Sequence, residues 1–401
     1  MQPEFTLFSI IMLLGAAHGL FLVLALLNTG KDNRAGHVYL ALLTLAFSID
    51  LGHEFLYQSR HLLNTLSIAF LDPVINLLYG PAFYLYVQVL TGDRTVARKG
   101  KAGMHLMPFG IGLVACFILP GLTPEQYVKL FYSKLQATAQ NEVMVLAVVG
   151  KIALASVVSI GVYLVLSLRR LRHHAKVIRQ QFSSIEQITL NWLRNLLLAL
   201  SVLYLILIFD GFFSRSLGLD ENVNRLLYLM VVAVIYTMGY LGLRQPVIFS
   251  QQMPVIDVPD EPRSESVTEA TAKYKTSALD AGMSAALQAD LQRHMETERP
   301  YLDSRLTLPL LAKQLSISPN YLSQVINERF GKNFFDFIND YRIEAAKQLL
   351  ADTINNDTSI VSIAYDAGFN SKSAFYTAFK KHVGVRPLAY RQTLLDKTDP
   401  V

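Results

Sequence analysis

The chain changes from long apolar segments to short amphipathic ones near residue 249. Before that point, seven apolar runs approach the roughly 20 residues that an α-helix needs to cross a bilayer. These predicted helices span residues 5–28, 37–57, 65–90, 105–120, 142–168, 194–213 and 225–248. After it, apolar residues recur at helical spacing in shorter segments. The pattern therefore predicts an all-α protein, with a seven-transmembrane helix bundle followed by a soluble domain of two helix-turn-helix units.

The composition agrees with this division. Hydrophobic residues make up 52% of the 401 residues and charged residues only 17%, whereas soluble domains carry about 25% charged residues. So apolar a chain is not intrinsically disordered over most of its length. The single cysteine, Cys116, excludes a disulfide framework and any Cys-based zinc or iron–sulfur site.

The distribution of Lys and Arg between the apolar runs predicts the orientation of the bundle. Alternate loops, beginning with residues 29–36, are the basic ones, and basic loops face the cytoplasm. We therefore expect the N-terminus outside and residues from 249 onward in the cytoplasm. The first run lacks a basic leading region and carries Glu4 instead, so we do not interpret it as a cleavable signal peptide. The basic loop residues are Lys31, Arg34, Arg94, Arg98, Lys99, Lys101, Arg169, Arg170, Arg172, Lys176 and Arg179.

Ionisable residues inside apolar helices are costly, and they are candidate functional groups for that reason. In the second helix, residues 50, 53, 54 and 57 follow a spacing that puts them on one face. With the orientation above, most of these groups lie in the outer half of the bundle. The pattern leaves open a ligand pocket, with Lys151 as counter-ion, and a purely structural polar network. The candidate pocket residues are His18, Asp50, His53, Glu54, Asp72, Lys151 and Asp210.

Two other functions for the bundle were weighed. An intramembrane metal hydrolase could use His18, His53, Asp50 and Asp72 as zinc ligands, but no HExxH-type ligand pair is present. We therefore expect no metal, no cofactor and no enzymatic activity. A transporter with an attached DNA-binding domain that reports substrate flux would place Asp72, Lys151 and Asp210 on the substrate path. The sequence shows no internal repeat of the kind that many transporters have.

Residues 250–286 separate the two regions. They contain Pro254, Pro259 and Pro262 among Ser, Thr, Asp and Glu, without lasting apolar periodicity. This composition predicts a flexible cytoplasmic linker. An alternative is a short helix near 266–290 that continues into the next domain. The predicted domains are a sensor of residues 1–249, the linker of residues 250–286 and a C-terminal domain of residues 287–401.

The C-terminal domain shows helix starts and stops at regular places. A first helix is expected at 287–299. A second, capped by Thr307, is followed by a short turn and a third from Pro319 to Phe330, which makes a helix-turn-helix. A long helix over 334–351 leads to a repeat of this arrangement, with helices at 359–367 and 372–383 and Ser371 as N-cap. The long helix spans roughly 27 Å at 1.5 Å per residue. It therefore allows both second helices to reach successive major grooves of one DNA face, about 34 Å apart.

The C-terminal domain carries the motif Ile360-x-x-Ile363-Ala364-x-x-x-Gly368-Phe369, followed by Gly384-x-x-Pro387-x-x-Tyr390-Arg391. Through these motifs, residues 287–395 resemble the DNA-binding domain of the AraC/XylS family. Arg386 stands where the family usually has Ser or Thr. The bundle also resembles the seven-helix sensor of some AraC-type regulators, through Gly80-Pro81, His105-Leu106, Trp192-Leu193-Arg194 and Gly242 to Pro246. The C-terminal motif residues are Ile360, Ile363, Ala364, Gly368, Phe369, Ser371, Ser373, Phe375, Phe379, Lys380, Lys381, Gly384, Pro387, Tyr390 and Arg391.

The resemblance implies a bacterial transcription regulator of the inner membrane that binds double-stranded promoter DNA. It implies RNA polymerase as a further partner and a small molecule as the signal, and it leaves a homodimer open. By position, the expected base contacts are Asn320, Ser323, Gln324, Lys372, Ser373, Tyr376 and Thr377, and the expected phosphate contacts are Lys380, Lys381 and Arg391.

Charge supports the same DNA face. Between Ser371 and Asp396 the only charged residues are Lys372, Lys380, Lys381, Arg386 and Arg391, all of them basic. The phenylalanines expected in the core of this domain are Phe330, Phe334, Phe369, Phe375 and Phe379. We expect the seventh helix and the linker to pass the signal from the bundle to the DNA-binding domain, either directly or by controlling dimerisation.

Overall fold

The computed structural model describes residues 5–28, 34–59, 71–92, 101–118, 140–186, 188–217, 221–244, 281–352 and 358–398. Within these ranges the chain is helical apart from turns and one isolated antiparallel bridge between Phe182 and Thr307. No strand occurs among them. The all-α prediction is therefore confirmed for the part of the chain that the structure describes.

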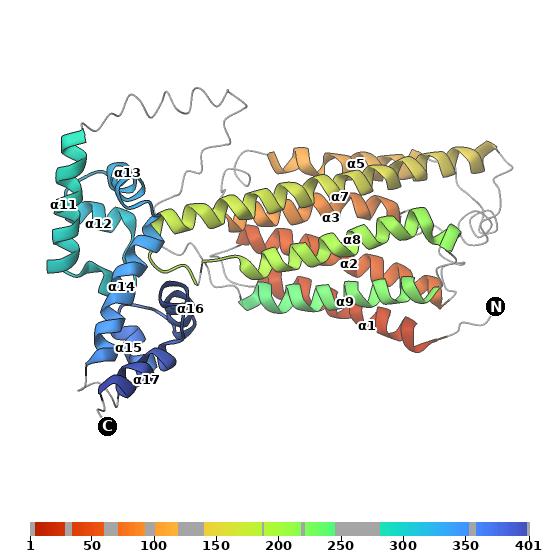
Figure 1. Ribbon diagram of the computed structural model, residues 1–401. Helices are drawn as coiled ribbons and strands as arrows, with labels where there is room; N and C mark the ends of the chain where they lie inside the picture. The colour runs from red at the N-terminus through yellow and green to blue at the C-terminus, as the bar shows by residue number, and fades with distance from the viewer. Residues whose placement is uncertain are drawn as a thin grey trace. The chain divides into compact units, whose positions relative to one another are not determined.

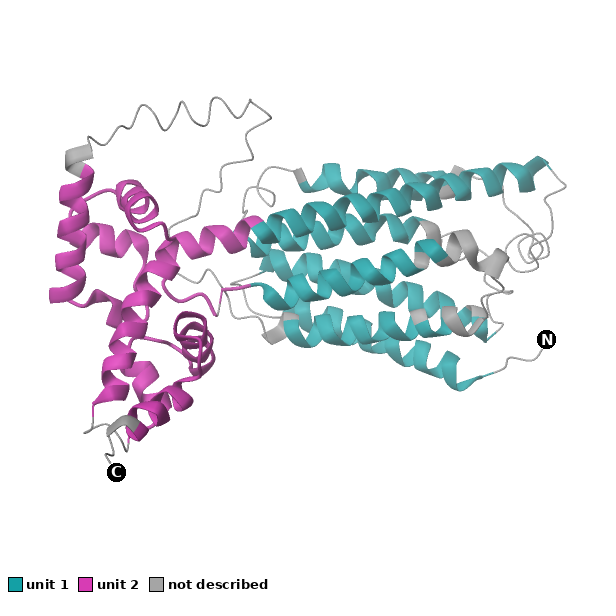
Figure 2. Ribbon diagram, viewed as in Figure 1, with its two compact units in different colours: residues 1–172, 190–258 teal, residues 173–189, 259–401 magenta. Residues whose placement is uncertain are grey.

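The chain divides into two compact units, coloured separately in Figure 2. The first unit contains Met1–Arg172 and Leu190–Val258, and the second contains His173–Thr189 and Pro259–Val401. This division differs from the linear order expected from the sequence, because a stretch from the middle of the chain packs with the C-terminal domain. We call residues 173–189 the mid-chain segment. The predicted linker lies largely outside the described residues.

The first unit is a bundle of helices that run side by side (Figure 1). Its core is built from the inward faces of these helices, with Met12, Leu40, Leu51 and Tyr86 almost completely buried. All seven predicted segments contain a helix. The helices are α1 (Leu7–Asn28), α2 (Arg34–Gln58), α3 (Leu71–Leu90), α5 (Lys101–Ile118), α7 (Gln140–Gln181), α8 (Asn191–Leu217) and α9 (Glu221–Arg244).

Helix α7 is much longer than the sequence pattern predicted. The apolar run ends at residue 168, but the helix continues through Arg169, Arg170 and Arg172 to Gln181. Charged residues end a membrane span without ending a helix, because Arg, Lys, Gln and Leu are all good helix formers. At 1.5 Å per residue the 42 residues of α7 extend about 63 Å, roughly twice the hydrocarbon thickness of a bilayer.

Three helical stretches of the described residues are long and apolar enough to cross a membrane: Leu7–Asn28, Arg34–Leu56 and Gln140–Gln181. Shorter apolar stretches occur at Val74–Leu90, Ala102–Ala115, Asn191–Ile206 and Tyr228–Leu241. These findings indicate association with a membrane. A bundle of seven spans stays a prediction.

The second unit consists of short helices whose starts are fixed by side-chain caps. Thr307, Ser318, Asn333, Ser359 and Ser371 each accept a hydrogen bond from a backbone N–H of the first helical turn. The helices are α11 (Ala281–Thr297), α12 (Leu308–Gln314), α13 (Pro319–Phe330), α14 (Phe334–Ala351), α15 (Ile360–Asp366), α16 (Lys372–Val383) and α17 (Pro387–Thr398), with a 3₁₀ turn at Pro300–Leu302.

Helix α14 joins two separate cores of this unit (Figure 1). Its first half contributes Phe334, Phe337 and Ile338 to a cluster with α11, α12 and α13. Its second half contributes Ile343, Ala346 and Leu350 to a cluster with α15 and α16. The expected core phenylalanines are confirmed in these clusters, with Phe330 only half-buried at the edge of the first. Each helix-turn-helix therefore has its own core, and α14 connects them.

Candidate nucleic-acid interface and ligand cavity

Helix α13 is the second helix of the first helix-turn-helix and carries three of the predicted base contacts. Asn320 is exposed in its first turn, and Ser323 and Gln324 are half-buried one turn later. The amide of Gln324 donates to Oε1 of Glu328 at 2.9 Å, and Asn327 donates to the Ser323 carbonyl at 2.8 Å. Leu322, Val325 and Ile326 hold the opposite face of α13 in the core.

Helix α16 is the corresponding helix of the second helix-turn-helix. Lys372, Ser373 and Thr377 are exposed on it, and Tyr376 is half-buried against the second core. The Lys372 ammonium lies 5.5 Å from the centroid of the Tyr376 ring, a cation–π distance. Phe375 and Phe379 anchor the other face of α16. Lys372, Ser373 and Thr377 therefore lie on the side away from the core, whereas Tyr376 packs partly against it.

The three predicted phosphate contacts differ in their surroundings. Lys380 is exposed. Lys381 forms an ion pair with Asp336 of α14 at 2.7 Å. Arg391 donates from Nη1 to the Thr358 carbonyl at 2.9 Å, next to the start of α15. The structure thus gives Lys381 and Arg391 structural contacts that the sequence did not predict, and phosphate binding by all three stays a prediction.

Two acidic residues of α14 tie the helix-turn-helix units together. Asp340 pairs with Lys332, which follows α13, and with Nδ1 of His382 on α16 at 2.9 Å. Asp336 pairs with Lys381. Burial of Asp336 favours a raised pKa, but hydrogen bonds from Lys381 and Asn333 and the nearby positive charges outweigh it. The pKa of Asp336 is therefore lowered from its ordinary value, which keeps it charged.

Arg342 in the middle of α14 was missed by the sequence analysis. Its side chain is fully buried, at 0% exposure, and it donates hydrogen bonds to Tyr301, Asp303, Ser183 and Ser184. Burial lowers the pKa of Arg342 to about 10, against the opposing charges of Glu186 and Asp303. A basic residue in an otherwise apolar stripe of a helix was the only signal that the sequence offered.

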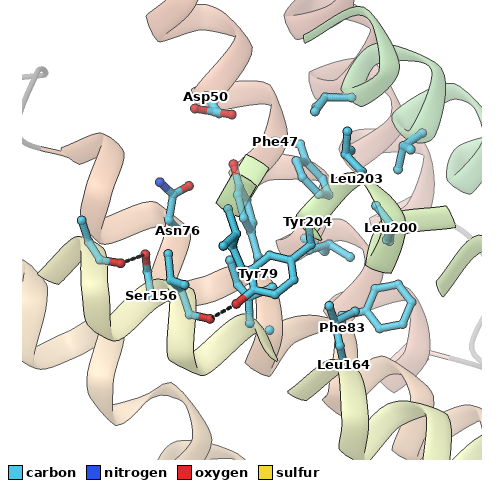
Figure 3. Close-up of a pocket in the computed structure, with 18 of the residues that line it drawn as sticks. Phe47, Asp50, Asn76, Tyr79, Phe83, Ser156, Leu164, Leu200, Leu203 and Tyr204 are labelled. Atoms are coloured by element: carbon cyan, nitrogen blue, oxygen red, sulfur yellow. Dashed lines mark hydrogen bonds between the residues drawn. The ribbon is translucent and has the colours of Figure 1, made fainter. Parts of the chain in front are cut away.

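The bundle contains a cavity of about 640 Å³ (Figure 3). Asp50 lies at one end of this cavity, and Phe83 and Leu164 lie at the other. Apolar side chains form most of its wall, and Asn76 and Ser156 add polar atoms. The size and lining are typical of sites for small molecules. Its walls come from α2, α3, α7, α8 and α9.

The structure separates the predicted pocket residues. Asp50 lines the cavity. His18 instead stacks on Tyr236, with centroids 4.0 Å apart, and Glu54 is buried and accepts a hydrogen bond from Gln58 at 2.7 Å. His53 is half-buried and Lys151 is exposed, and neither lines the cavity. The side chains of Asp72 and Asp210 lie outside the described residues.

The role of Lys151 as a counter-ion stays a prediction. No ion pair of Lys151 is found among the described residues, and its side chain is exposed. No group of three or more His, Cys, Asp or Glu residues in the described part of the chain is arranged to hold a metal ion.

Comparison with known proteins identifies the C-terminal region. Residues 311–393 match the family of the helix-turn-helix domain. The chain is 36% identical over 90 residues to the melibiose operon regulatory protein of Escherichia coli, covering 22% of this chain and 29% of that one. The C-terminal region carries an AraC-type helix-turn-helix domain.

Two further matches cover the same AraC-type region. The HTH-type transcriptional regulator YtdP of Bacillus subtilis is 36% identical over 90 residues, which is 22% of this chain and 11% of that protein. A solved structure, the C-terminal domain of the two-component response regulator yesN from Fusobacterium nucleatum, is 34% identical with a TM-score of 0.24. It covers 26% of this chain and 98% of that one. The chain spans less than a third of the length of the two curated relatives.

Proposed function

We propose that the chain is a membrane-embedded one-component transcription regulator. Its bundle binds a small molecule, and its AraC-type domain binds promoter DNA through two helix-turn-helix units. The observation that carries the proposal is the presence, on one chain, of this domain and of a helix bundle that holds a cavity and includes three helices apolar enough to cross a membrane. The AraC-type domain and its relatives support a regulator rather than an enzyme.

The DNA-binding half of the proposal rests on exposure and charge. The exposed side chains of α13 and α16 supply amide, hydroxyl and ammonium groups, which are the groups that read base edges in a major groove. Both helices are second helices of their units, the position of recognition helices. Lys380 is exposed and suited to a phosphate contact.

The sensing half rests on the cavity. Because its wall is mostly apolar, we expect a largely apolar small molecule, with a polar or cationic group near Asp50. Of the predicted pocket residues, this assignment retains Asp50. The structure gives His18 and Glu54 packing contacts within the bundle instead.

Placement in the cell follows from the same proposal. The regulator is a multi-pass protein of the bacterial inner membrane, with the N-terminus outside and the AraC-type domain in the cytoplasm, where it meets the promoter and RNA polymerase. The lipid bilayer covers the outer face of the bundle. Dimerisation on DNA is compatible with the proposal but not required by it, because one chain carries two recognition helices.

Genome-wide DNA occupancy of the full chain tests the DNA-binding half. We expect the chain to occupy a small set of promoters, and Lys372→Ala to weaken binding at those sites, because an exposed ammonium on α16 is lost. Lys313→Ala is the matched control, since Lys313 is exposed on α12, the first helix of its unit. Absence of sequence-specific occupancy by the full chain contradicts the proposal.

A reporter driven by an occupied promoter tests the sensing half. Asp50→Asn removes the acidic group from the cavity and should change the output or the response of the reporter to growth conditions. Lys151→Ala is the control, because Lys151 is exposed and does not line the cavity. If Asp50→Asn leaves the reporter unchanged and Lys151→Ala alters it, the cavity is not the sensing site.

A further inference from the structure

The end of α7 packs into the same compact unit as the AraC-type domain. Helix α7 ends at Gln181, and the chain then continues through Phe182, Ser183 and Ser184. We call residues 182–184 the α7 tail. Phe182 is almost buried and Ser183 is 1% exposed. Polar loop residues this deeply buried require specific partners.

Backbone and side-chain atoms of the α7 tail bond the loop before α12. Phe182 forms an antiparallel bridge with Thr307. The Ser183 N–H donates to the Leu306 carbonyl at 3.3 Å, and the Ser183 hydroxyl donates to the same oxygen at 2.6 Å. The tail therefore pairs with residues 306–307 in the manner of a short added strand.

Arg342 completes the contact from the other side. Its Nη1 donates to the Ser183 carbonyl at 2.8 Å and to the Ser184 hydroxyl at 3.3 Å, and its Nη2 donates to the Ser183 hydroxyl at 3.0 Å. The remaining bonds run from Nη2 to the Asp303 carbonyl at 2.9 Å and from Nε to the Tyr301 carbonyl at 2.8 Å.

These five bonds use every N–H donor of the guanidinium. Three of them go to the α7 tail. Without the tail, Nη1 would lose both of its partners while the charge stayed in a buried site. Removal of the partners of a buried charge is strongly unfavourable. Arg342 therefore favours the docked tail over an undocked one.

Other residues of the mid-chain segment add to the contact. The Arg179 guanidinium lies 5.9 Å from the centroid of the Phe335 ring on α14. The negative charge of Glu186 stabilises the charged form of Arg342. The first is a cation–π contact and the second is an attraction between opposite charges, so electrostatic interactions add to the hydrogen bonds of the dock.

The contact lies beside the joint between the two helix-turn-helix units. The Arg342 guanidinium carbon is 5.8 Å from the centroid of the Phe369 ring, in the turn of the second unit. In the same turn, a Cβ on Gly368 would lie 2.4 Å from the Tyr301 carbonyl oxygen, the oxygen that Arg342 bonds. A change at the α7 tail therefore reaches both helix-turn-helix units.

We propose that the surface formed by Tyr301, Asp303, Leu306, Thr307 and Arg342 is a docking site for the α7 tail of the same chain. The dock attaches the AraC-type domain to the bundle through α7, independently of residues 250–286. It is also the route by which the bundle acts on DNA binding, a part that rests on the proposed function. From the sequence, this route was expected in the seventh helix and the linker.

Cleavage of the linker in the full chain tests the attachment. A site-specific protease sequence is inserted after Pro262, the purified chain is cleaved in detergent, and the N-terminal fragment is captured through a tag at its start. If the dock holds, the C-terminal fragment is retained with the N-terminal one. Release of the wild-type fragment as soon as the chain is cut overturns the proposal.

Two variants of the α7 tail test whether the dock is what retains the C-terminal fragment. Neither changes a residue of the helix-turn-helix cores. Ser183→Ala removes the hydroxyl from a charge-assisted bond and should speed release of the fragment about tenfold. Ser183→Pro also removes the N–H donor and should speed release further. Ser362→Ala, at an exposed serine of α15, is the control and should release as the wild type does. Equal release by all four chains overturns the assignment to Ser183.

Hydrogen exchange gives a second measurement that needs no cleavage. The Ser183 amide should exchange slowly in the intact chain and faster in Arg342→Ala. Arg329→Ala is the matched control, because Arg329 bonds Ser284 and not the tail. Fast exchange at Ser183 in the wild type contradicts the dock.

Promoter output tests the regulatory route. Ser183→Pro should change the output several-fold, whereas a Gly-Ser insertion after Pro262 should leave it as in the wild type. If the insertion changes the promoter output and Ser183→Pro does not, the route runs through residues 250–286. That result overturns the regulatory part of the proposal. If the wild-type chain drives no promoter, the proposed function fails, while fragment retention still decides whether the dock exists.

Discussion

The two compact units place their large apolar side chains in opposite ways. In the bundle, Phe21 is 68% exposed and Leu14 is 59% exposed on α1. In the AraC-type unit, Phe337, Phe375 and Phe379 are almost completely buried. An extended apolar outer surface is unfavourable in water and marks contact with a membrane or a partner. The difference indicates that the units are suited to different surroundings, although helices make up most of the described residues in both.

The strongest test of this difference is to replace one phenylalanine in each unit by alanine. Phe375→Ala should destabilise the AraC-type unit by about 3–5 kcal/mol, because it leaves a cavity in a closed core. Phe21→Ala should cost only about 0.5 kcal/mol, because its ring faces outward. Thermal unfolding of the detergent-solubilised chain, followed by proteolysis of each unit, measures both. A large loss from Phe21→Ala would mean that α1 is covered by protein.

Arginine at an exposed leucine sharpens the comparison further. Leu14→Arg on α1 should cost about 3 kcal/mol of insertion, since it places a charge near the middle of a candidate membrane span. Leu388→Arg on α17, where the leucine is 63% exposed, should change stability by less than about 0.5 kcal/mol. The membrane-bound fraction and the yield of each variant report the result. Equal behaviour of the two variants would contradict a lipid-facing α1.

Two glycines within the AraC-type unit separate backbone strain from close packing. Gly368 has a φ of +89° and lies against the backbone of Tyr301 and Leu302. Gly368→Ala should therefore cost about 2–3 kcal/mol. Gly331 has a φ of +65° with no heavy atom near its Cβ position, so Gly331→Ala should cost about 1 kcal/mol. Equal losses of stability would show that the turn at Gly368 opens without penalty.

The smallest expected effect is a dependence of stability on pH at the Asp336–Lys381 pair. The pKa of Asp336 is lowered in the folded chain. Its contribution is therefore complete above its ordinary pKa of 3.8 and is lost as the pH falls through the lowered value. Lys381→Ala should weaken this dependence, since Asn333 and Arg179 still lower the pKa of Asp336, with a loss of less than about 1 kcal/mol near neutral pH. The free energy of unfolding of wild type and variant, measured from about pH 2 to about pH 7, checks this expectation. An unchanged acid transition in Lys381→Ala contradicts the pairing.

The helices of the AraC-type unit could be predicted closely because their ends are local. Thr307 and Ser371 were predicted as N-caps, and both accept the expected backbone hydrogen bonds. Gly331 and Gly384 follow the last residues of α13 and α16 with positive φ. Each signal lies within a few residues of the structure it sets, so the sequence alone reveals it. Lys372 and Thr377, which the family resemblance places among the base contacts, are exposed.

The candidate ligand site and the dock could not be predicted in the same way. The helical spacing of Asp50, His53 and Glu54 gives a shared face, but it does not say which of them reaches the cavity. The extension of α7 was missed because hydropathy measures a membrane span and not a helix. Ser183, a partner of Arg342 in the dock, lies 159 residues away in the chain, and no local pattern links residues at that separation.

This separation also sets an order of events during synthesis. A ribosome adds about 5–20 residues per second, so Ser183 emerges roughly 8–32 s before Arg342 is made, given the 159 residues between them. Until Leu306, Thr307 and Arg342 are made, Phe182 and Ser183 lack these C-terminal partners. The AraC-type domain therefore reaches its final structure only after α7 is complete, and shortening the chain from its start removes part of that domain's own interior.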